Sequence, residues 1–219
     1  MVDRMKSLIA MLSSLANSPE DKALIAMALN ALDDQYDLSR KMDQEPGLIE
    51  IIKQLVGRIY RAYSMSSALK GKRILDIASG STTSKAPSFV YVNTPFGEQT
   101  IHVRSSEGYT AQFEPWFCRI LLELGADPVG VDLGNLDSER FEHYQVDLGL
   151  PGALNFLSDH SFDAVHDSRL FGSPEFTAQL PNSADRLKVA EEIWQQEQRL
   201  LKVDGIVIHS DAGDLVQQT

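Results

Sequence analysis

Acidic side chains and one histidine stand where short apolar runs of this sequence end. The runs close on or beside Asp76, Asp132, Asp147 and the pair His166–Asp167. Carboxylates accept hydrogen bonds from hydroxyl and ammonium groups, and a histidine beside a carboxylate is a candidate general base. The pattern therefore predicts a site for a polar ligand, provided that the fold gathers these run ends at one edge.

The runs themselves have the composition of buried strands, and helical patterns lie between them. One helix is expected over 115–124, closed by Gly125, and another over 184–201, capped by Ser183. Strands that alternate with helices predict an α/β fold with a doubly wound, mostly parallel sheet. In such a sheet, ligands bind beyond the carboxyl ends of the strands, where the strand order reverses. The expected strands are 73–78, 127–132, 144–147, 162–166 and 205–209.

Residues 1–70 are expected to form helices only, and residues 71–219 the α/β domain. Three helical patterns are visible, the second of them opened by Ser18 as an N-cap and Pro19 in the first turn. The third begins at Gly47 and carries a wide apolar face, which is typical of a helix between two layers. We expect this region to be a helical cap or a dimerisation element.

Residues 81–114 interrupt what is normally a short strand-to-helix turn. Inside them, 88–92 and 100–103 alternate in polarity around 93–97, which predicts a β-hairpin. The insertion lies between the first strand and the helix from Pro115, over the mouth of the predicted site. We expect a mobile lid; a surface ornament, or strands added at the sheet edge, is the alternative.

Charge and composition exclude several classes of protein. The 219 residues carry 31 acids against 20 bases and a net charge of −11, which disfavours a nucleic-acid partner. No apolar stretch approaches the length of a membrane span, and the N-terminus lacks the pattern of a secretory signal. The single cysteine, Cys118, fits a buried thiol in a reduced, cytoplasmic protein. The five histidines show no pair at metal-ligand spacing, so no metal site is expected.

The segment 74–81 resembles the first motif of class I S-adenosylmethionine-dependent methyltransferases, an acid followed by x-Gly-x-Gly. Gly80 matches the second glycine, while Ala78 stands in place of the first. Both residues are small enough for the backbone to approach a ligand closely. The resemblance runs in order from 72 to 210, interrupted by the insertion. It implies a Rossmann-like methyltransferase fold, here without the family's last strands.

The resemblance also implies roles for single residues toward S-adenosylmethionine. Asp132 would accept from both ribose hydroxyls, and Asp147 from the adenine amino group. Asp76 would face the ammonium, and Gly80, with Ala78 beside it, would lie near the methionine carboxylate. Glu114, just before the helix from Pro115, would meet the ammonium or the sulfonium.

Methyl transfer to a small-molecule or peptide-borne acceptor is the function that this resemblance implies. His166 and Asp167 are the candidate catalytic residues, with His209 in reserve. The phosphate-binding loop, the dinucleotide fingerprint Gly-x-Gly-x-x-Gly and the nucleophile elbow Gly-x-Ser-x-Gly are absent from the sequence. The alternative is a non-catalytic binding or assembly module that keeps the fold and uses its N-terminal helices for contact with a partner.

Overall fold

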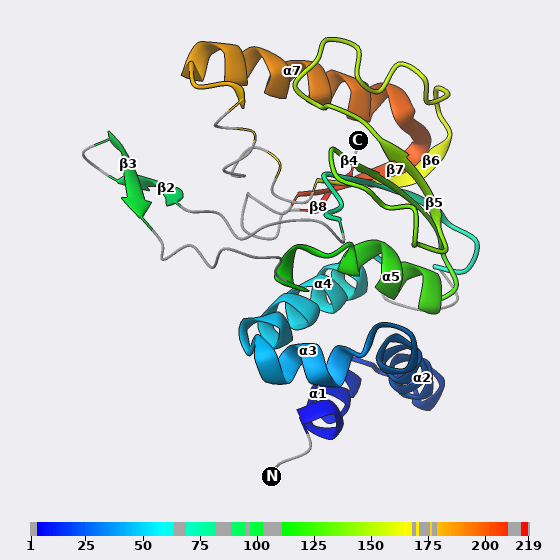
Figure 1. Ribbon diagram of the computed structural model, residues 1–219. Coiled ribbons are helices and arrows are strands. Elements are labelled where there is room, and N and C mark those ends of the chain that lie inside the picture. The colour runs from blue at the N-terminus through cyan, green and yellow to red at the C-terminus, as the bar shows by residue number, and fades with distance from the viewer. Residues whose placement is uncertain are drawn as a thin grey trace.

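In the computed structural model the chain forms a six-stranded sheet with helices on both sides (Figure 1). The structure describes residues 4–63, 69–81, 89–94, 97–102, 111–167, 170, 176, 179–209 and 216–218. Of 89–94, 97–102, 209 and 216–218 it describes the backbone alone.

The sheet has the order β5-β4-β1-β6-β7-β8, and its first five strands are parallel. The central strand is β1, and the chain builds first outward to β4 and β5 and then, on the other side, to β6 and β7. This reversal confirms the predicted doubly wound, Rossmann-like sheet. The short strand β8 pairs antiparallel with β7. The strands are β1 (Arg73–Ile77), β4 (Asp127–Asp132), β5 (Glu142–Gln145), β6 (Phe162–Asp167), β7 (Leu201–His209) and β8 (Val216–Gln218).

Two strand predictions need correction. Strand β5 was expected over 144–147 but spans Glu142–Gln145, because its pairing with β4 runs from Val129 to Asp132, the last residue of β4. Strand β7 begins at Leu201, well before the expected start. Its pairing with β6 shifts register between Phe162 and Ala164, so residues 202–205 form an irregularity inside the strand.

Over residues 4–63, the part of the helical region that the structure describes, there are four helices where the sequence predicted three. Asp37 adopts a left-handed backbone with φ 57°, which ends the second helix and starts a short third one. Asp33 caps this third helix, since its carboxylate accepts from the backbone and the hydroxyl of Ser39 at 2.6 and 2.8 Å. Ser18 caps the second helix as expected. The helices are α1 (Arg4–Ser13), α2 (Pro19–Tyr36), α3 (Leu38–Gln44) and α4 (Gly47–Tyr63).

Among the described residues, the α/β part also contains the helices α5 and α7 and a 3₁₀ turn. The turn η1 (Ala111–Phe113) leads into α5 (Trp116–Glu123), and α7 (Ser183–Leu200) precedes β7. The N-cap of α7 is Asn182, which accepts from the amide of Ala184, and not Ser183 as predicted. Within the described residues, no helix is both long and apolar enough to cross a lipid bilayer.

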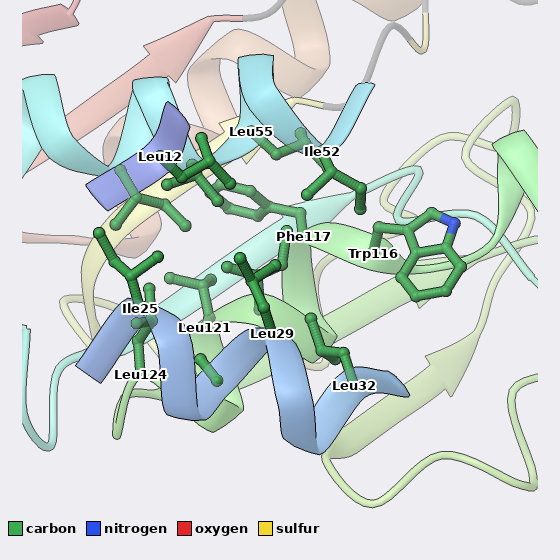
Figure 2. Packing of buried hydrophobic residues seen from close by; sticks show 14 of the residues in the cluster. Leu12, Ile25, Leu29, Leu32, Ile52, Leu55, Trp116, Phe117, Leu121 and Leu124 are labelled. Carbon is green, nitrogen blue, oxygen red and sulfur yellow. The ribbon is translucent and has the colours of Figure 1, made fainter. Parts of the chain in front are cut away.

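The hydrophobic core has one part on each face of the sheet. Ile74 belongs to the part that α1, α2, α4 and α5 cover, and its neighbour Leu75 to the part that α7 covers. Adjacent strand residues point to opposite faces, so both faces of β1 are buried. Figure 2 shows the first part, where Phe117 and Leu121 of α5 lie among Ile25, Leu29, Ile52 and Leu55. The helical region and α5 therefore share one continuous core.

The predicted hairpin is present as β2 (Phe89–Thr94) and β3 (Gly97–His102), paired antiparallel. It forms a separate two-stranded sheet, so it does not extend the edge of the main sheet (Figure 1). The expected lid spans 81–114, and its segments 82–88 and 103–110 lie outside the described residues. That role stays a prediction.

Candidate ligand-binding site

The carboxyl ends of β1, β4 and β6 bring the predicted site residues to one edge of the sheet. Asp76 on β1 is in register with His166 on β6, and Asp167 lies beside Ile77. Asp132 closes β4 on the other side of β1. These three strands meet at the point where the strand order reverses, which is the ligand-binding position of a doubly wound sheet.

The loop after β1 is tied to the end of β4 by the Asp132 carboxylate. One oxygen accepts from the amide of Gly80 at 2.8 Å, and the other accepts from the amide of Gly134 at 2.7 Å. Burial raises the pKa of Asp132, as does the nearby charge of Asp76, while the two amides act in the opposite direction. A carboxylate has further lone pairs, so Asp132 can still accept from a ligand hydroxyl.

The same loop needs small residues for two different reasons. Ala78 and Gly80 both have left-handed backbones, with φ of 56° and 89°. A Cβ on Gly80 would lie 2.2 Å from the carbonyl oxygen of Phe113, which is closer than any real contact. Ser81 donates to this same oxygen at 3.0 Å. Gly80 is therefore required by close backbone approach, whereas Ala78 tolerates a strained conformation that glycine would adopt freely.

Asp76, His166 and Arg58 form a buried chain of polar contacts below this loop. The Nδ1 atom of His166 lies 2.7 Å from Asp76, and its Nε2 atom lies 3.5 Å from a guanidinium nitrogen of Arg58. A guanidinium can only donate, so Nε2 accepts and Nδ1 carries the proton that it donates to Asp76. In this arrangement the Asp76 carboxylate accepts a hydrogen bond from His166, which lies between Asp76 and Arg58.

His166 is fully buried, and its ring stacks on Phe117 with centroids 3.8 Å apart. Both of its nitrogens face side chains of the chain itself, an arrangement that favours an orienting role toward Asp76. Asp167 is 2% exposed and lies opposite His209 of β7 in the strand register. The prediction that His166 or Asp167 acts as a general base stays a prediction.

Cys118 touches the site from α5. It is buried, as expected, and its Sγ lies 3.6 Å from a carboxylate oxygen of Asp76. Burial raises the pKa of this thiol well above its ordinary value, and the charge of Asp76 adds to the effect. The thiol therefore stays protonated and acts as a weak donor to Asp76.

Asp147 lies just beyond β5, next to the end of β4. The bond from Val146 to the carbonyl of Asp132 brings the two acids to the same edge. The Asp147 carboxylate accepts from the amide of Gly149 at 2.9 Å, which shapes a tight turn there. Its expected contact with an adenine amino group stays a prediction.

Glu114 is placed differently from the other predicted ligands. Its side chain is fully buried between two cations, Lys41 of α3 at 2.6 Å and Arg119 of α5. Arg119 also binds Glu139, at 2.6 and 3.1 Å, and its guanidinium lies over the ring of Tyr36. The charge of Glu114 is thus balanced by the chain itself, and the geometry favours a structural role over the predicted contact with the ligand's ammonium or sulfonium.

A cavity of about 370 Å³ opens at the opposite, amino-terminal ends of the strands. Tyr63 and Asp163 line it, together with Lys72 and Lys202, which both bind Asp163. Asp204 also lines the cavity, so two lysines face two acids and the charges cancel. Ligands of doubly wound sheets bind at the other edge. The candidate site therefore remains at the carboxyl ends.

Arg58 is the site residue that sequence reasoning missed. It lies on the wide-faced helix α4 and is 8% exposed, between the buried residues Val56 and Ile59. A charged residue within an apolar face is a signal for a buried partner. That partner, His166, is 108 positions away and could not be identified from the spacing.

Comparison with known proteins gives similarity in structure alone. No family model and no curated protein matches the chain. A putative S-adenosyl-L-methionine-dependent methyltransferase from Methanococcus maripaludis aligns over 77% of this chain, at 13% identity and a TM-score of 0.37. The trans-methyltransferase CalH in complex with SAH aligns over 94% of this chain, at 11% identity and a TM-score of 0.35. The CurJ carbon methyltransferase aligns over 93%, at 13% identity and a TM-score of 0.36.

The chain spans 59%, 52% and 47% of the lengths of these three proteins. At such identities and TM-scores, the similarity carries no weight of its own. The fold class follows from the strand order and register described above.

Proposed function

We propose that this chain binds S-adenosylmethionine at the carboxyl edge of the sheet and transfers its methyl group to a small-molecule or peptide-borne acceptor. The observation that carries the proposal is the bond from Gly80 to Asp132. It joins the small-residue loop of β1 to the acid at the end of β4, at the point where the strand order reverses.

The residues present fit the cofactor. Asp132 offers carboxylate oxygens for two vicinal ribose hydroxyls, and charge-assisted hydrogen bonds of this kind are the stronger ones. Asp76 is oriented by His166 and offers carboxylate oxygens that suit a cationic ammonium. The left-handed backbone at Ala78 and Gly80 leaves the loop without a bulky side chain.

The bound cofactor would supply an activated methyl group on a sulfonium. The task of the chain is then to hold the acceptor and this methyl group in line. Asp167, at the end of β6, follows His166 and lies beside Ile77 of β1, and it is suited to orient an acceptor. A general base is needed only for a poorly acidic hydroxyl or a protonated amine.

We expect S-adenosylhomocysteine to raise the melting temperature of the protein, because a ligand that binds only the native state stabilises it. At a ligand concentration about 100 times the Kd, the gain is about 2.7 kcal/mol. Differential scanning fluorimetry measures the shift. An unchanged melting temperature at millimolar ligand, with a folded chain by circular dichroism, would contradict the proposal and favour a non-catalytic assembly module.

Asp132→Ala is expected to weaken S-adenosylhomocysteine binding by about 1.5–3 kcal/mol, since the ribose hydroxyls lose their charged acceptor. Isothermal titration calorimetry gives the affinity. Asp137→Ala is a suitable control, because Asp137 is exposed in the loop that follows β4 and takes no part in the Gly80 contact. A loss below about threefold for Asp132→Ala would show that the ribose acceptor is assigned wrongly.

A further inference from the structure

We propose that Glu45, which connects α3 and α4, is a positioning residue of the cofactor site. Its carboxylate holds η1, and η1 in turn holds the Gly80–Ser81 loop. The inference rests on the proposed function and assigns part of the ligand site to the helical region.

The first step is the contact between Glu45 and η1. The two carboxylate oxygens accept from the amides of Ala111 and Gln112, at 2.8 and 3.3 Å. These amides begin a 3₁₀ turn, so they have no partner earlier in the turn itself. One side chain therefore satisfies two donors and fixes both the position and the orientation of η1.

The second step is the contact between η1 and the loop after β1. The carbonyl of Phe113, the last residue of η1, accepts from the amide of Ser81 at 3.0 Å. The same oxygen occupies the space next to Gly80 that a Cβ would need. A shift of η1 therefore moves or releases Ser81 and its neighbour Gly80, which was expected to lie near the methionine carboxylate.

Other contacts of the helical region act on the same segment. Gln112 lies against the start of α4, with its side-chain nitrogen 3.1 Å from where a Cβ on Gly47 would be. Lys41 binds Glu114, the residue that follows η1. Residues 111–114, which lead into α5, are thus held by Lys41 of α3, by Glu45 and by the start of α4. We call these contacts the clamp. Asp132, by contrast, is held by its place in β4 and by the amide of Gly134, neither of which involves η1, so we expect it to keep its position when η1 shifts.

Glu45→Gln tests the part of the predicted site that faces the amino-acid portion of the ligand separately from the part that faces its adenosine. A neutral amide can accept only through its oxygen, and its nitrogen would face an amide donor of η1. We expect the affinity for S-adenosylhomocysteine to fall about tenfold. The affinity for 5′-deoxy-5′-methylthioadenosine, which has the same adenosine but no amino-acid part, should change less than about twofold, since Asp132 is untouched. Calorimetry on the full chain gives both affinities.

Asp33→Asn is the matched control, because Asp33 also accepts two hydrogen bonds in the helical region but caps α3, away from η1. It should leave both affinities within about twofold of wild type. An equal loss of both ligands in Glu45→Gln would indicate general loosening and overturn the proposal, as would no loss at all.

The clamp also has a readout without ligand. In Glu45→Gln the amide of Ser81 should exchange with solvent at least about tenfold faster than in wild type, and in Asp33→Asn it should not. If wild type binds neither compound, the proposed function fails. Unchanged Ser81 exchange, measured by nuclear magnetic resonance, refutes the clamp independently.

Discussion

Replacing Arg119 with leucine is expected to lower the free energy of unfolding by about 3–5 kcal/mol, the largest effect predicted for a single substitution in this chain. The Arg119 side chain is 2% exposed, and both of its carboxylate partners, Glu114 and Glu139, are fully buried. Leucine would leave Glu139 without this partner in a low-dielectric interior and Glu114 with one fewer cation. Chemical denaturation measures the change.

Arg140→Leu is the comparison variant, because it removes an arginine from an ion pair that is more exposed than the Arg119 group. Arg140 binds Glu123, also on α5, but its side chain is 51% exposed, so the pair is solvated and screened. Its loss should cost less than about 1 kcal/mol. Similar costs for the two arginine variants would mean that the Glu114–Arg119–Glu139 group is not closed to water. Adding Glu139→Gln to the Arg119→Leu variant should restore part of the loss, because the uncompensated charge is then removed, whereas Glu114 keeps Lys41 as its partner.

Gly80→Ala is expected to destabilise the fold by about 2–4 kcal/mol and to weaken ligand binding in parallel. About 1 kcal/mol comes from placing a side chain on a left-handed backbone, and about 1–3 kcal/mol from overpacking against the Phe113 carbonyl. The atom that lies 2.2 Å from the added Cβ is the backbone oxygen of Phe113, which cannot move aside as the end of a flexible side chain can.

Gly125→Ala measures the first contribution alone, so the difference between the two variants gives the overpacking contribution. Its φ of 88° nearly equals the 89° of Gly80, but a Cβ there has nothing within 4 Å. It should therefore cost only the backbone strain of about 1 kcal/mol. Thermal or chemical unfolding of both variants gives the difference. Equal costs would show that η1 yields easily, which would also weaken the positioning role inferred for Glu45.

Much of the architecture could be predicted from local patterns. The strand–helix alternation, the hairpin of β2 and β3 and the cap at Ser18 depend on residues within a few positions of one another. Hydrophobic periodicity reports which side of an element is buried, so it predicts elements and their order well. The ends of β5 and β7 were placed wrongly because they depend on how each strand pairs with its neighbour.

For the candidate site, too, some features could be predicted from the sequence and others depend on contacts between distant residues. Since parallel strands share one carboxyl edge, the sequence alone determined that Asp76, Asp132 and the His166–Asp167 pair meet there. Only the tertiary structure decided what these groups face. The pairing of His166 with Arg58, of Glu114 with Lys41, and of Gly80 with Phe113 joins residues 33 to 108 positions apart. Such partners are chosen by the stacking of helices on the sheet, a long-range geometry that leaves no periodic signal in the chain.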